Sequence, residues 1–413
     1  MVQERGIARS AGARHDLRIN KKNVRDIDVN GKRVLVRVDF NVPIDKATGD
    51  ILDDTRIAAA LPTINYLREH NAKTVLVSHL GRPDGKAVDA LRLARVAARL
   101  GELMGAEVRA ASDVVGESAR QTVDALEPGG VAMLENVRFE PGEEKNDPAL
   151  AQKLAAFGDV YVNDAFGTAH RAHASTEGVA HILPAVAGLL MQKEIDYLGR
   201  VVSDPERPLA AIIGGAKISS KIAVLRHLLS KVDTLLIGGG MANTFLKAQG
   251  VSVGASLVEE DRLDEARATM REATDRNVDL GLPIDAVVGD RFAADATGSI
   301  ATLDAVPAEA MILDVGPKTV QAYEQKLATA KTVVWNGPLG VAEWEAFAQG
   351  SVELARYLAK SDATVIIGGG ETVALVSDLG LAPAFAHVST GGGASLEFLE
   401  GRTLPGVAAL QDR

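Results

Sequence analysis

Two lysines that lie four residues apart follow an apolar run and a pair of glycines. The run Leu209–Ile213 predicts a buried strand, Gly214-Gly215 predicts a tight turn, and the helical pattern that follows contains Lys217 and Lys221. We expect both lysines on one face of the first helical turn. Because glycine turns and helix N-termini favour anions, two cations at this point indicate a polyanionic ligand. The alternative is that both lysines only solvate an exposed helix face.

The same order of strand, glycine turn and helix occurs again directly afterwards. Thr234–Ile237 runs into Gly238-Gly239-Gly240, and a helical pattern begins at Met241. Other apolar runs in the second half also end at glycines: Asp285–Val288, Met311–Val315, Thr332–Trp335, Thr364–Ile367 and His387–Thr390. Glycine lets the backbone approach a ligand closely. Each turn alone is common in α/β proteins, but several at one sheet edge predict a slot of nucleotide size.

Basic side chains follow the strands predicted in the first half. These strands are Arg33–Val38, Thr74–Val77, Val131–Leu134 and Val160–Val162. The segments around them supply arginines and histidines with two hydrogen-bonding partners: Arg56, Arg82, Arg138, Arg171, His79, His170 and His173, with Asp39 and Asn41. Guanidinium groups bind phosphate and carboxylate through two parallel hydrogen bonds. A single arginine after a strand usually forms a surface ion pair, but clusters at equivalent strand ends predict an anion pocket.

The alternation of elements predicts an α/β protein with two doubly wound, Rossmann-like parallel-sheet lobes joined by a hinge. Helical patterns such as Thr55–Asn71 and Leu91–Met104 separate the strands. The segment Gly178–Arg200 has the pattern of a long amphipathic helix interrupted at Pro184, and polar residues follow it up to Pro208. We place an N-terminal domain at residues 1–188, an interdomain helix and hinge at 189–207, and a C-terminal domain at 208–395.

Composition excludes several classes of protein. A net charge of −10 over 413 residues argues against a general nucleic-acid binder. The absence of cysteine excludes disulfides, thiolate metal sites and cysteine nucleophiles, and it fits a reducing cytoplasm. No run has the apolar length of a membrane helix. Residues 1–18 lack the apolar core of a secretory signal, and we expect a frayed extension there rather than a targeting sequence.

A basic pocket in one lobe and a glycine-walled slot in the other favour phosphoryl transfer between a small anion and a nucleotide. The chain has neither a Walker-type P-loop nor the dinucleotide-binding fingerprint, so the nucleotide site must be of another kind. Phosphoryl transfer depends on positioning and charge neutralisation more than on covalent catalysis. Basic side chains and Mg²⁺ would supply the positive charge, and closure of two lobes would exclude water.

Nine motifs, in the same order along the chain, closely resemble those of the phosphoglycerate kinase family. They are RVDFNVP (37–43), SHLGRP (78–83), LENVRF (134–139), FGTAHRAHAS (166–175), IGGAKISSK (213–221), GGGMANTFL (238–246), LDVGPKT (313–319), WNGPLGVAEWEAF (335–347) and STGGGASLEFLEG (389–401). The resemblance begins near Ile19 and covers nearly the whole chain. It implies a two-lobed kinase that reversibly transfers the acyl phosphate of 1,3-bisphosphoglycerate to ADP, giving ATP and 3-phosphoglycerate, with Mg²⁺. The attacking carboxylate of the reverse reaction is already ionised near neutral pH, so no general base is required.

The matches to these motifs also imply roles for individual residues. The implied substrate-binding residues are Asp39, Asn41, Arg56, His79, Arg82, Arg138 and Arg171. The implied nucleotide-binding residues are Gly215, Ala216, Lys217, Lys221, Gly239, Gly240, Asn336, Gly337, Pro338, Glu343 (on the ribose), Gly370, Glu371 and Thr372. The implied catalytic residues are Arg56, Lys217, Gly370 and Gly393. Repulsion between the reacting anions is the barrier that Arg56, Lys217 and Mg²⁺ would lower.

Two positions depart from the family pattern. Glu371 stands where the family usually has the aspartate associated with the nucleotide's metal; Mg²⁺ accepts either carboxylate, so we expect a working site with altered affinity. Ser219-Ser220 replaces a pair whose second residue is acidic in many members, and we expect little effect. The C-terminal segment of about residues 396–413 resembles the tail that packs back on the first lobe.

Two other functions are compatible with parts of the sequence. A non-catalytic nucleotide-binding or scaffolding protein would keep the fold, but it would not need the intact set of Arg56, Lys217 and Lys221. Another two-lobed kinase could use the basic pocket for a different small acid, but the full set of motifs does not favour it. The resemblance implies a monomer, and the composition predicts a cytoplasmic protein that binds neither nucleic acid nor membranes.

Overall fold

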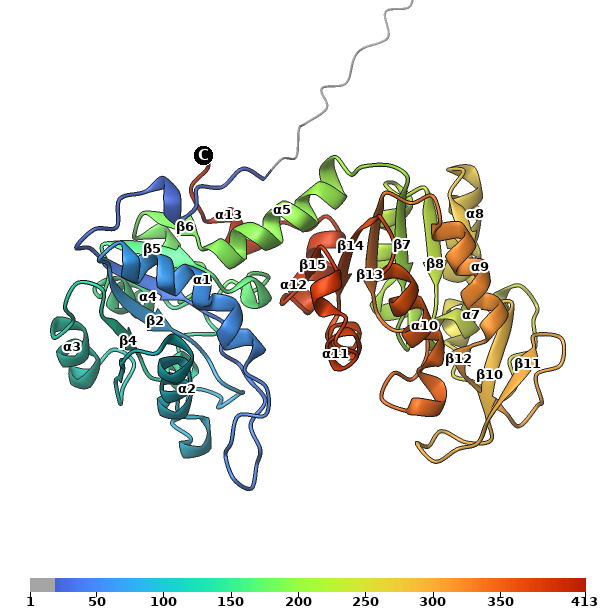
Figure 1. The fold of residues 1–413 in the computed structure, drawn as a ribbon, viewed down its shortest axis with the longest axis horizontal. Helices are drawn as coiled ribbons and strands as arrows, with labels where there is room; N and C mark the ends of the chain where they lie inside the picture. The colour runs from blue at the N-terminus through green and yellow to red at the C-terminus, as the bar shows by residue number, and fades with distance from the viewer. Residues whose placement is uncertain (1–18) are drawn as a thin grey trace, which may run out of the picture.

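The computed structural model describes residues 19–413; the extension expected at residues 1–18 lies outside the described residues. Two α/β lobes each contain a six-stranded sheet, and a helix runs between them (Figure 1). The two-lobed parallel-sheet fold expected from the sequence is thereby confirmed. None of the helices within residues 19–413 is long and apolar enough to cross a membrane.

The first lobe is a parallel sheet in the order β3-β4-β2-β1-β5-β6. These strands are Val108–Ala110, Val131–Met133, Lys73–Val77, Arg33–Arg37, Val160–Asn163 and Ala185–Ala187. Every neighbouring pair is parallel, so the carboxyl ends of all the strands lie at one edge. Both faces are covered: Val34 and Val36 of β1 pack into one core and Leu35 packs into the other. The helices of this lobe are α1 (Thr55–Glu69), α2 (Ala94–Met104), α3 (Glu117–Asp124) and α4 (Pro148–Ala155).

The second lobe repeats this plan with the strand order β15-β14-β13-β7-β8-β9. These strands are His387–Val388, Thr364–Gly368, Thr332–Asn336, Leu209–Ile213, Thr234–Ile237 and Asp279–Gly281. Its helices are α6 (Ile222–Leu229), α7 (Gly240–Ala248), α8 (Leu263–Asp275), α9 (Pro317–Leu327), α10 (Gln349–Leu358) and α11 (Gly370–Asp378). All five residues of β7 are buried, as expected for a strand covered on both faces.

Two of the apolar runs do not belong to this parallel sheet, and our expectation for them was wrong. Asp285–Gly289 (β10) and Met311–Val315 (β12) form a separate antiparallel sheet with Gly298–Thr302 (β11). The reason is the short connection at residues 290–297, which leaves no room for the crossover helix that a parallel pair requires.

The segment predicted as an interrupted helix at Gly178–Arg200 contains three different elements. Gly178–His181 is a 3-10 turn, Ala185–Ala187 is the edge strand β6, and Leu189–Ser203 is α5. Pro184 favours an extended conformation before β6, and Gly188 is the N-cap of α5. Helix α5 runs from the first lobe towards the second (Figure 1). The proposed domain boundaries at 188 and 207 lie at its two ends and stay a prediction.

A buried carboxylate on α5 holds the segment that follows β15. The side chain of Glu194 is completely buried; its Oε2 accepts hydrogen bonds from His387 Nε2 (2.7 Å) and Ser389 Oγ (2.8 Å). Its Oε1 accepts from the backbone N–H (2.7 Å) and the hydroxyl (2.9 Å) of Thr390. The turn Gly391–Gly393 begins directly after these residues, so Glu194 fixes its position relative to α5.

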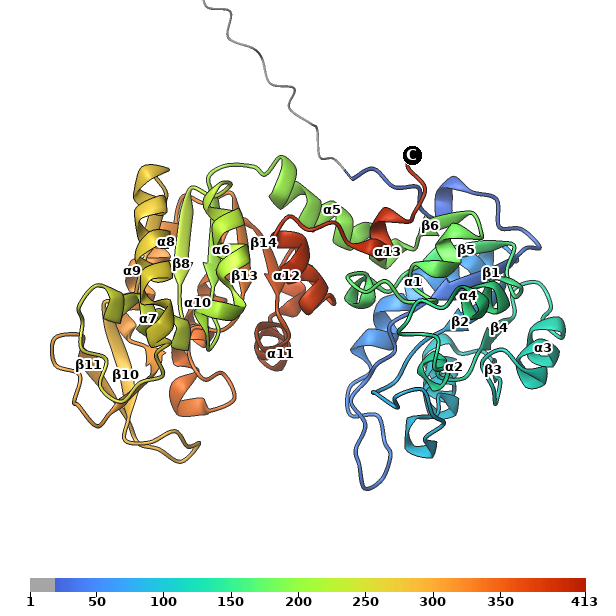
Figure 2. The same ribbon diagram turned by 180° about the vertical axis from the view of Figure 1, so that it is seen from behind.

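The chain returns to the first lobe at its C-terminus (Figure 2). After α12 (Gly393–Leu399), the short helix α13 (Pro405–Ala408) lies against the first lobe, where the N–H of Gly406 bonds to the carbonyl of Ala169 at 2.8 Å. Further on, the N–H of Gln411 bonds to the carbonyl of Ala185 in β6 at 2.9 Å. Lys21 Nζ donates to the carbonyl of Leu410 at 2.7 Å. The two ends of the described chain therefore lie together beside β6.

We predict that Glu194→Gln lowers the free energy of unfolding by roughly 2–4 kcal/mol. The amide nitrogen of the glutamine would face N–H and O–H groups that now donate hydrogen bonds to a carboxylate oxygen. Urea unfolding followed by circular dichroism measures the change. Asp196→Asn is the matched control on the same helix: Asp196 is exposed and, among residues 19–413, accepts a hydrogen bond only from Gln192. Equal stability of the two variants would show that the negative charge of Glu194 does not stabilise the fold.

Candidate functional site

A cavity of about 290 Å³ lies at the carboxyl edge of the first sheet. All seven predicted substrate-binding residues line it: Asp39, Asn41, Arg56, His79, Arg82, Arg138 and Arg171. Its remaining wall contains Gly81, Gly167, Thr168 and His170 from the first lobe and Gly391–Gly393 from the turn after β15. Residues that are far apart in the sequence meet here because β1, β2, β4 and β5 end at the same edge.

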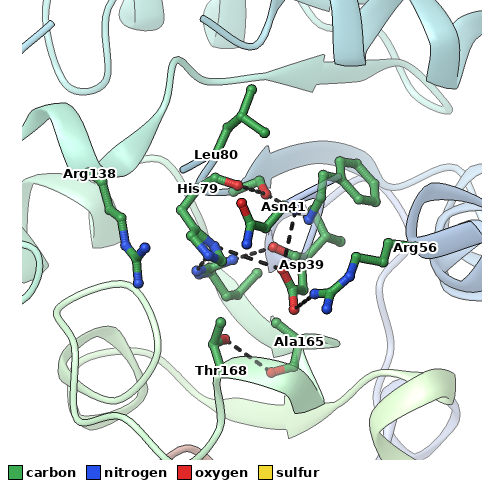
Figure 3. A network of polar contacts seen from close by, with 12 residues as sticks. Asp39, Asn41, Arg56, His79, Leu80, Arg138, Ala165 and Thr168 are labelled. Carbon is green, nitrogen blue, oxygen red and sulfur yellow. Dashed lines mark hydrogen bonds and ion pairs between the residues drawn. The ribbon is translucent and has the colours of Figure 1, made fainter. Parts of the chain in front are cut away.

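Asp39 lies at the centre of the polar contacts in this cavity (Figure 3). Its Oδ2 accepts a hydrogen bond from Arg56 Nη1, and its Oδ1 accepts from the N–H of Asn41 at 3.3 Å. Burial raises the pKa of Asp39, but the interaction with His79, the charges of Arg56 and Arg37 and the bond from Asn41 outweigh burial, and the pKa falls below its usual value. An ionised Asp39 therefore orients the Arg56 guanidinium.

His79 is held as a neutral imidazole. Arg37 Nη2 lies 3.1 Å from His79 Nδ1, and an arginine can only donate, so Nδ1 accepts and the proton is on Nε2. Burial lowers the pKa of His79 well below its usual value, and the charges of Arg37, Arg138 and Arg171 lower it further against the opposing effect of Asp39. His79 thus contributes a hydrogen-bonding ring to the cavity, while the arginines contribute the positive charge.

Arg138 and Asn41 fasten neighbouring loops of the cavity to each other. Arg138 Nη1 donates to the carbonyl of Gly81 at 2.8 Å, and its Nε lies 3.2 Å from Glu144 Oε1. The amide oxygen of Asn41 accepts from the N–H of Gly81 at 2.8 Å. The loops after β1, β2 and β4 are therefore tied together before any ligand binds. Arg82, in contrast, is exposed at the rim.

The predicted nucleotide turns meet at the carboxyl edge of the second sheet. Gly215-Ala216 follows β7, Gly239-Gly240 follows β8, Asn336–Pro338 follows β13 and Gly370–Thr372 follows β14. These turns pack backbone against backbone: Gly239 has φ +69°, and a Cβ on it would lie 2.5 Å from the carbonyl oxygen of Gly215. The hydroxyl of Thr372 accepts from the N–H of Gly337 at 2.9 Å and links two of the turns.

The two lysines do not share a helix face, and our expectation was wrong. Lys217 has extended backbone and precedes a 3-10 turn, Ile218–Ser220, and Lys221 lies between that turn and α6. The lysine side chains also differ in environment. Lys217 is exposed, whereas Lys221 is partly buried and its Nζ donates to Asn336 Oδ1 at 2.7 Å. Burial lowers the pKa of Lys221, and nearby Glu371 and Glu400 oppose this effect.

Glu371 and Glu343, the acidic residues predicted near the nucleotide, are both exposed. Glu371 is the second residue of α11, and Glu343 precedes the 3-10 turn Glu345–Phe347. Within residues 19–413 there is no group of three or more acidic or histidine side chains that could hold a metal ion. A single carboxylate still fits Mg²⁺, which is commonly bound by one or two carboxylates together with substrate phosphates and water.

The predicted residues therefore form two groups rather than one continuous site. The turn Gly391–Gly393 brings the backbone of the second lobe into the basic cavity, with Gly393 close to His170. Lys217, Lys221 and Glu371 are not among the residues that line this cavity. A ligand in the basic cavity and one at the nucleotide turns would approach each other from opposite lobes.

Comparisons with known proteins give one consistent family. A sequence model of the family described as phosphoglycerate kinase matches residues 24–402. The phosphoglycerate kinase of Moorella thermoacetica is 57% identical over 393 residues, which cover 95% of this chain and 100% of that protein. The phosphoglycerate kinase of Chloroflexus aggregans is 56% identical over 399 residues, with the same coverage of 95% and 100%.

The chain belongs to the phosphoglycerate kinase family. The fold agrees: the structure of phosphoglycerate kinase from Coxiella burnetii matches with a TM-score of 0.86 and 45% identity over 94% of this chain and 98% of that one. The structure from Pyrococcus horikoshii matches with a TM-score of 0.83 and 34% identity over the same shares, 94% and 98%. The protein is thus a phosphotransferase of the phosphoglycerate kinase type, and its family uses adenine nucleotides as substrates.

Sequence reasoning missed several residues that build the basic site of this protein. Arg37 is buried beneath the cavity, where it donates to Ser175 Oγ at 2.9 Å as well as to His79. Ser175 in turn donates to the buried carboxylate of Glu143. The signal for Arg37 was present, since it is a charged residue within the apolar strand run RVLVRV. Glu143 gave no comparable signal because its burial depends on distant segments.

The lowered pKa of His173 predicts that stability depends on pH below neutrality. Burial, followed by the charges of Arg138, Arg37 and Arg171, lowers the pKa of His173 to about 4. The unfolded chain takes up this proton near pH 6.5, so it binds more protons than the folded state in between, and the free energy of unfolding decreases as the pH falls from about 6.5 to about 4.

We expect His173→Gln to flatten this decrease, as measured by urea unfolding between about pH 7 and about pH 5. The same substitution at His70, an exposed residue just after α1, is the control and should leave the slope as it is. A slope that is identical in the His173 variant and the wild-type protein would contradict the assignment.

Proposed function

We propose that the protein catalyses reversible transfer of the acyl phosphate of 1,3-bisphosphoglycerate to ADP, which gives ATP and 3-phosphoglycerate. The observation that carries the proposal is the basic cavity, where all seven predicted substrate residues lie around one space of about 290 Å³. Several guanidinium groups around one small space suit a ligand with a carboxylate and a phosphate. Family membership supports the same substrates.

In this proposal the first lobe binds the three-carbon substrate. Arg138, Arg171 and Arg82 neutralise its phosphate and carboxyl groups, and Asn41 and neutral His79 donate hydrogen bonds. Arg56 is oriented by Asp39 and stabilises the charge of the phosphoryl group in transfer. No side chain needs to remove a proton, because the attacking group is a carboxylate in one direction and a nucleotide phosphate in the other.

The second lobe binds the nucleotide in this proposal. Gly215, Ala216, Gly239, Gly240 and the turn Asn336–Pro338 approach the adenosine with backbone, and Glu343 binds the ribose. Lys217 and Lys221 neutralise the phosphates, and backbone N–H groups at Gly370–Thr372 and Gly393 face the transferring group. Glu371 would hold the magnesium ion of the nucleotide, which neutralises phosphate charge when bound.

Closure of the lobes completes the site in this proposal. The lysines lie outside the basic cavity, so transfer requires the two groups of residues to approach each other. Closure also excludes water, which would otherwise hydrolyse the acyl phosphate. One chain supplies both groups, so a monomer is sufficient, as expected for a cytoplasmic enzyme without nucleic-acid or membrane partners; light scattering on the purified protein tests the oligomeric state.

The test of this function is ATP consumption in the presence of Mg²⁺ and 3-phosphoglycerate, coupled to reduction of the product. We expect turnover only when 3-phosphoglycerate is present. ATP binding without any turnover would instead indicate a nucleotide-binding protein that has lost catalysis. Turnover with another small acid but not with 3-phosphoglycerate would indicate a kinase of different specificity.

We predict that Arg56→Lys lowers kcat by about a hundredfold or more, because lysine replaces a fixed two-pronged donor with a single flexible one. The KM values for both substrates should change much less, since Arg56 acts on the transferring group. Arg68→Lys, near the opposite end of α1, is the matched control and should retain wild-type kcat. A rise in the KM values of similar size, without a fall in kcat, would show that Arg56 binds the substrate in its ground state instead.

The proposed role of Glu371 predicts a change in the Mg²⁺ dependence of turnover. Glu371→Gln removes the negative charge, so half-maximal activity should require several times more free Mg²⁺, with about a fivefold increase expected. Glu371→Asp keeps the carboxylate and should lie closer to the wild-type protein. If titrations with free Mg²⁺ at saturating ATP give the same midpoint for the Gln variant and the wild-type protein, Glu371 is not a metal ligand.

A further inference from the structure

The segment that carries the two lysines is a short turn that is largely exposed except at Ile218, whose side chain is buried in the core. It contains the single 3-10 turn Ile218–Ser220, closed by a bond from the N–H of Lys221 to the carbonyl of Ile218 at 2.8 Å. At its start the carbonyl of Gly215 accepts from the N–H of Met241 at 3.0 Å. At its end Lys221 bonds to Asn336. Between these two anchors, Lys217 is exposed and its backbone is extended.

One carboxylate holds the middle of this turn from outside. Glu259 Oε2 accepts from the N–H of Ser219 at 3.0 Å, and its Oε1 accepts from the hydroxyl of the same residue at 2.6 Å. The N–H of Glu259 in turn donates to Thr244 Oγ1 on α7 at 3.2 Å. The turn between the lysines is thereby connected to the helix that begins at the neighbouring glycine turn, Gly239-Gly240.

The two hydrogen bonds from Ser219 to Glu259 restrain both the backbone and the side chain of this residue between the lysines. A carboxylate that accepts from both the backbone and the side chain of one residue restricts the rotation of that residue as well as its distance. Burial raises the pKa of Glu259, but hydrogen bonding by Ser219 and Ile218 and the charge of Lys217 outweigh burial and lower the pKa, so the acceptor is ionised at neutral pH. Ser219 thereby gains a structural role that the sequence did not indicate.

We propose that Glu259 is a positioning residue of the nucleotide site: it holds the Ile218–Ser220 turn so that Lys217 and Lys221 are aligned on the phosphates. The inference rests on the proposed assignment of both lysines to the nucleotide. Glu259 itself touches no substrate in this role. Its negative charge lies close to Lys217, so an opposite effect is also to be tested. In that case the charge of Glu259 would weaken phosphate binding, and its hydrogen bonds to Ser219 would not affect ATP binding.

Two substitutions of Glu259 separate these roles. Glu259→Ala removes both the charge and the anchor. Glu259→Gln removes the charge but keeps the shape, because its amide oxygen can accept from the N–H of Ser219 and its NH₂ can donate to the hydroxyl. Glu260→Ala is the matched control, since Glu260 is the next residue and pairs with Lys247 on the surface. Steady-state kinetics with ATP and 3-phosphoglycerate, each varied at saturation of the other, give the two KM values and kcat.

If Glu259 positions the lysines, Glu259→Ala raises the KM for ATP by about five- to tenfold and leaves the KM for 3-phosphoglycerate within about twofold. Glu259→Gln and Glu260→Ala stay within about twofold of the wild-type protein for both substrates. In the Lys217→Ala background, Glu259→Ala should have a smaller effect than it has alone, because the group that it positions is absent.

Three results would overturn the inference. A lower KM for ATP in both Glu259 variants would show that the charge, not the anchor, matters. Equal rises of both KM values in Glu259→Ala would indicate a general loss of structure, and an unchanged KM for ATP would show that buried Ile218 holds the turn without Glu259. The single variant Lys217→Ala separates this inference from the proposed function: if it leaves ATP kinetics unchanged, the lysine assignment itself is wrong.

Discussion

The buried carboxylate of Glu194 is the constraint on which the arrangement of both lobes depends. It lies on the helix between the lobes and accepts four hydrogen bonds from His387, Ser389 and Thr390. A fully buried carboxylate that loses its hydrogen-bond donors strongly destabilises the fold, so these hydrogen bonds remain when α5 moves. The turn Gly391–Gly393 therefore moves with α5, and this turn is the part of the second lobe that lines the basic cavity.

The two groups of site residues solve the problem of binding anions in different ways. In the first lobe the charge comes from arginines fixed by Asp39, Glu144 and carbonyl groups, while buried His79 and His173 are kept neutral. The charge of this cavity is thus nearly constant around neutral pH. In the second lobe most of the wall is backbone, and the charge comes from one partly buried lysine and one exposed lysine. Most of the first group is held by hydrogen bonds before any ligand binds, and the second depends on how its lysine turn is held.

The sequence was sufficient for the parts of the fold that follow from periodicity. Strand ends in a parallel sheet share an edge, so residues as far apart as Asp39 and Arg171 could be assigned to one cavity. The sequence was not sufficient where contacts between distant segments determine the structure. β6 is a strand because it pairs with β5, and β10 runs antiparallel to β11 because the connection between them is short. The partners of Arg37 and Glu194 come from distant segments, and no local pattern identifies them.

The closing of the chain on itself limits how the lobes can move. The chain passes between them along α5 and again after α12, and the second passage ends in bonds from Gly406 to Ala169 and from Gln411 to Ala185. Both passages lie on the side of the molecule where the ends of the chain lie (Figure 2). The easiest relative motion of the lobes is therefore a rotation about that side. Such a rotation is compatible with the contacts of Glu194, because α5 and the segment that Glu194 holds would move together. The closure proposed for the two lobes therefore does not require Glu194 to lose its hydrogen bonds.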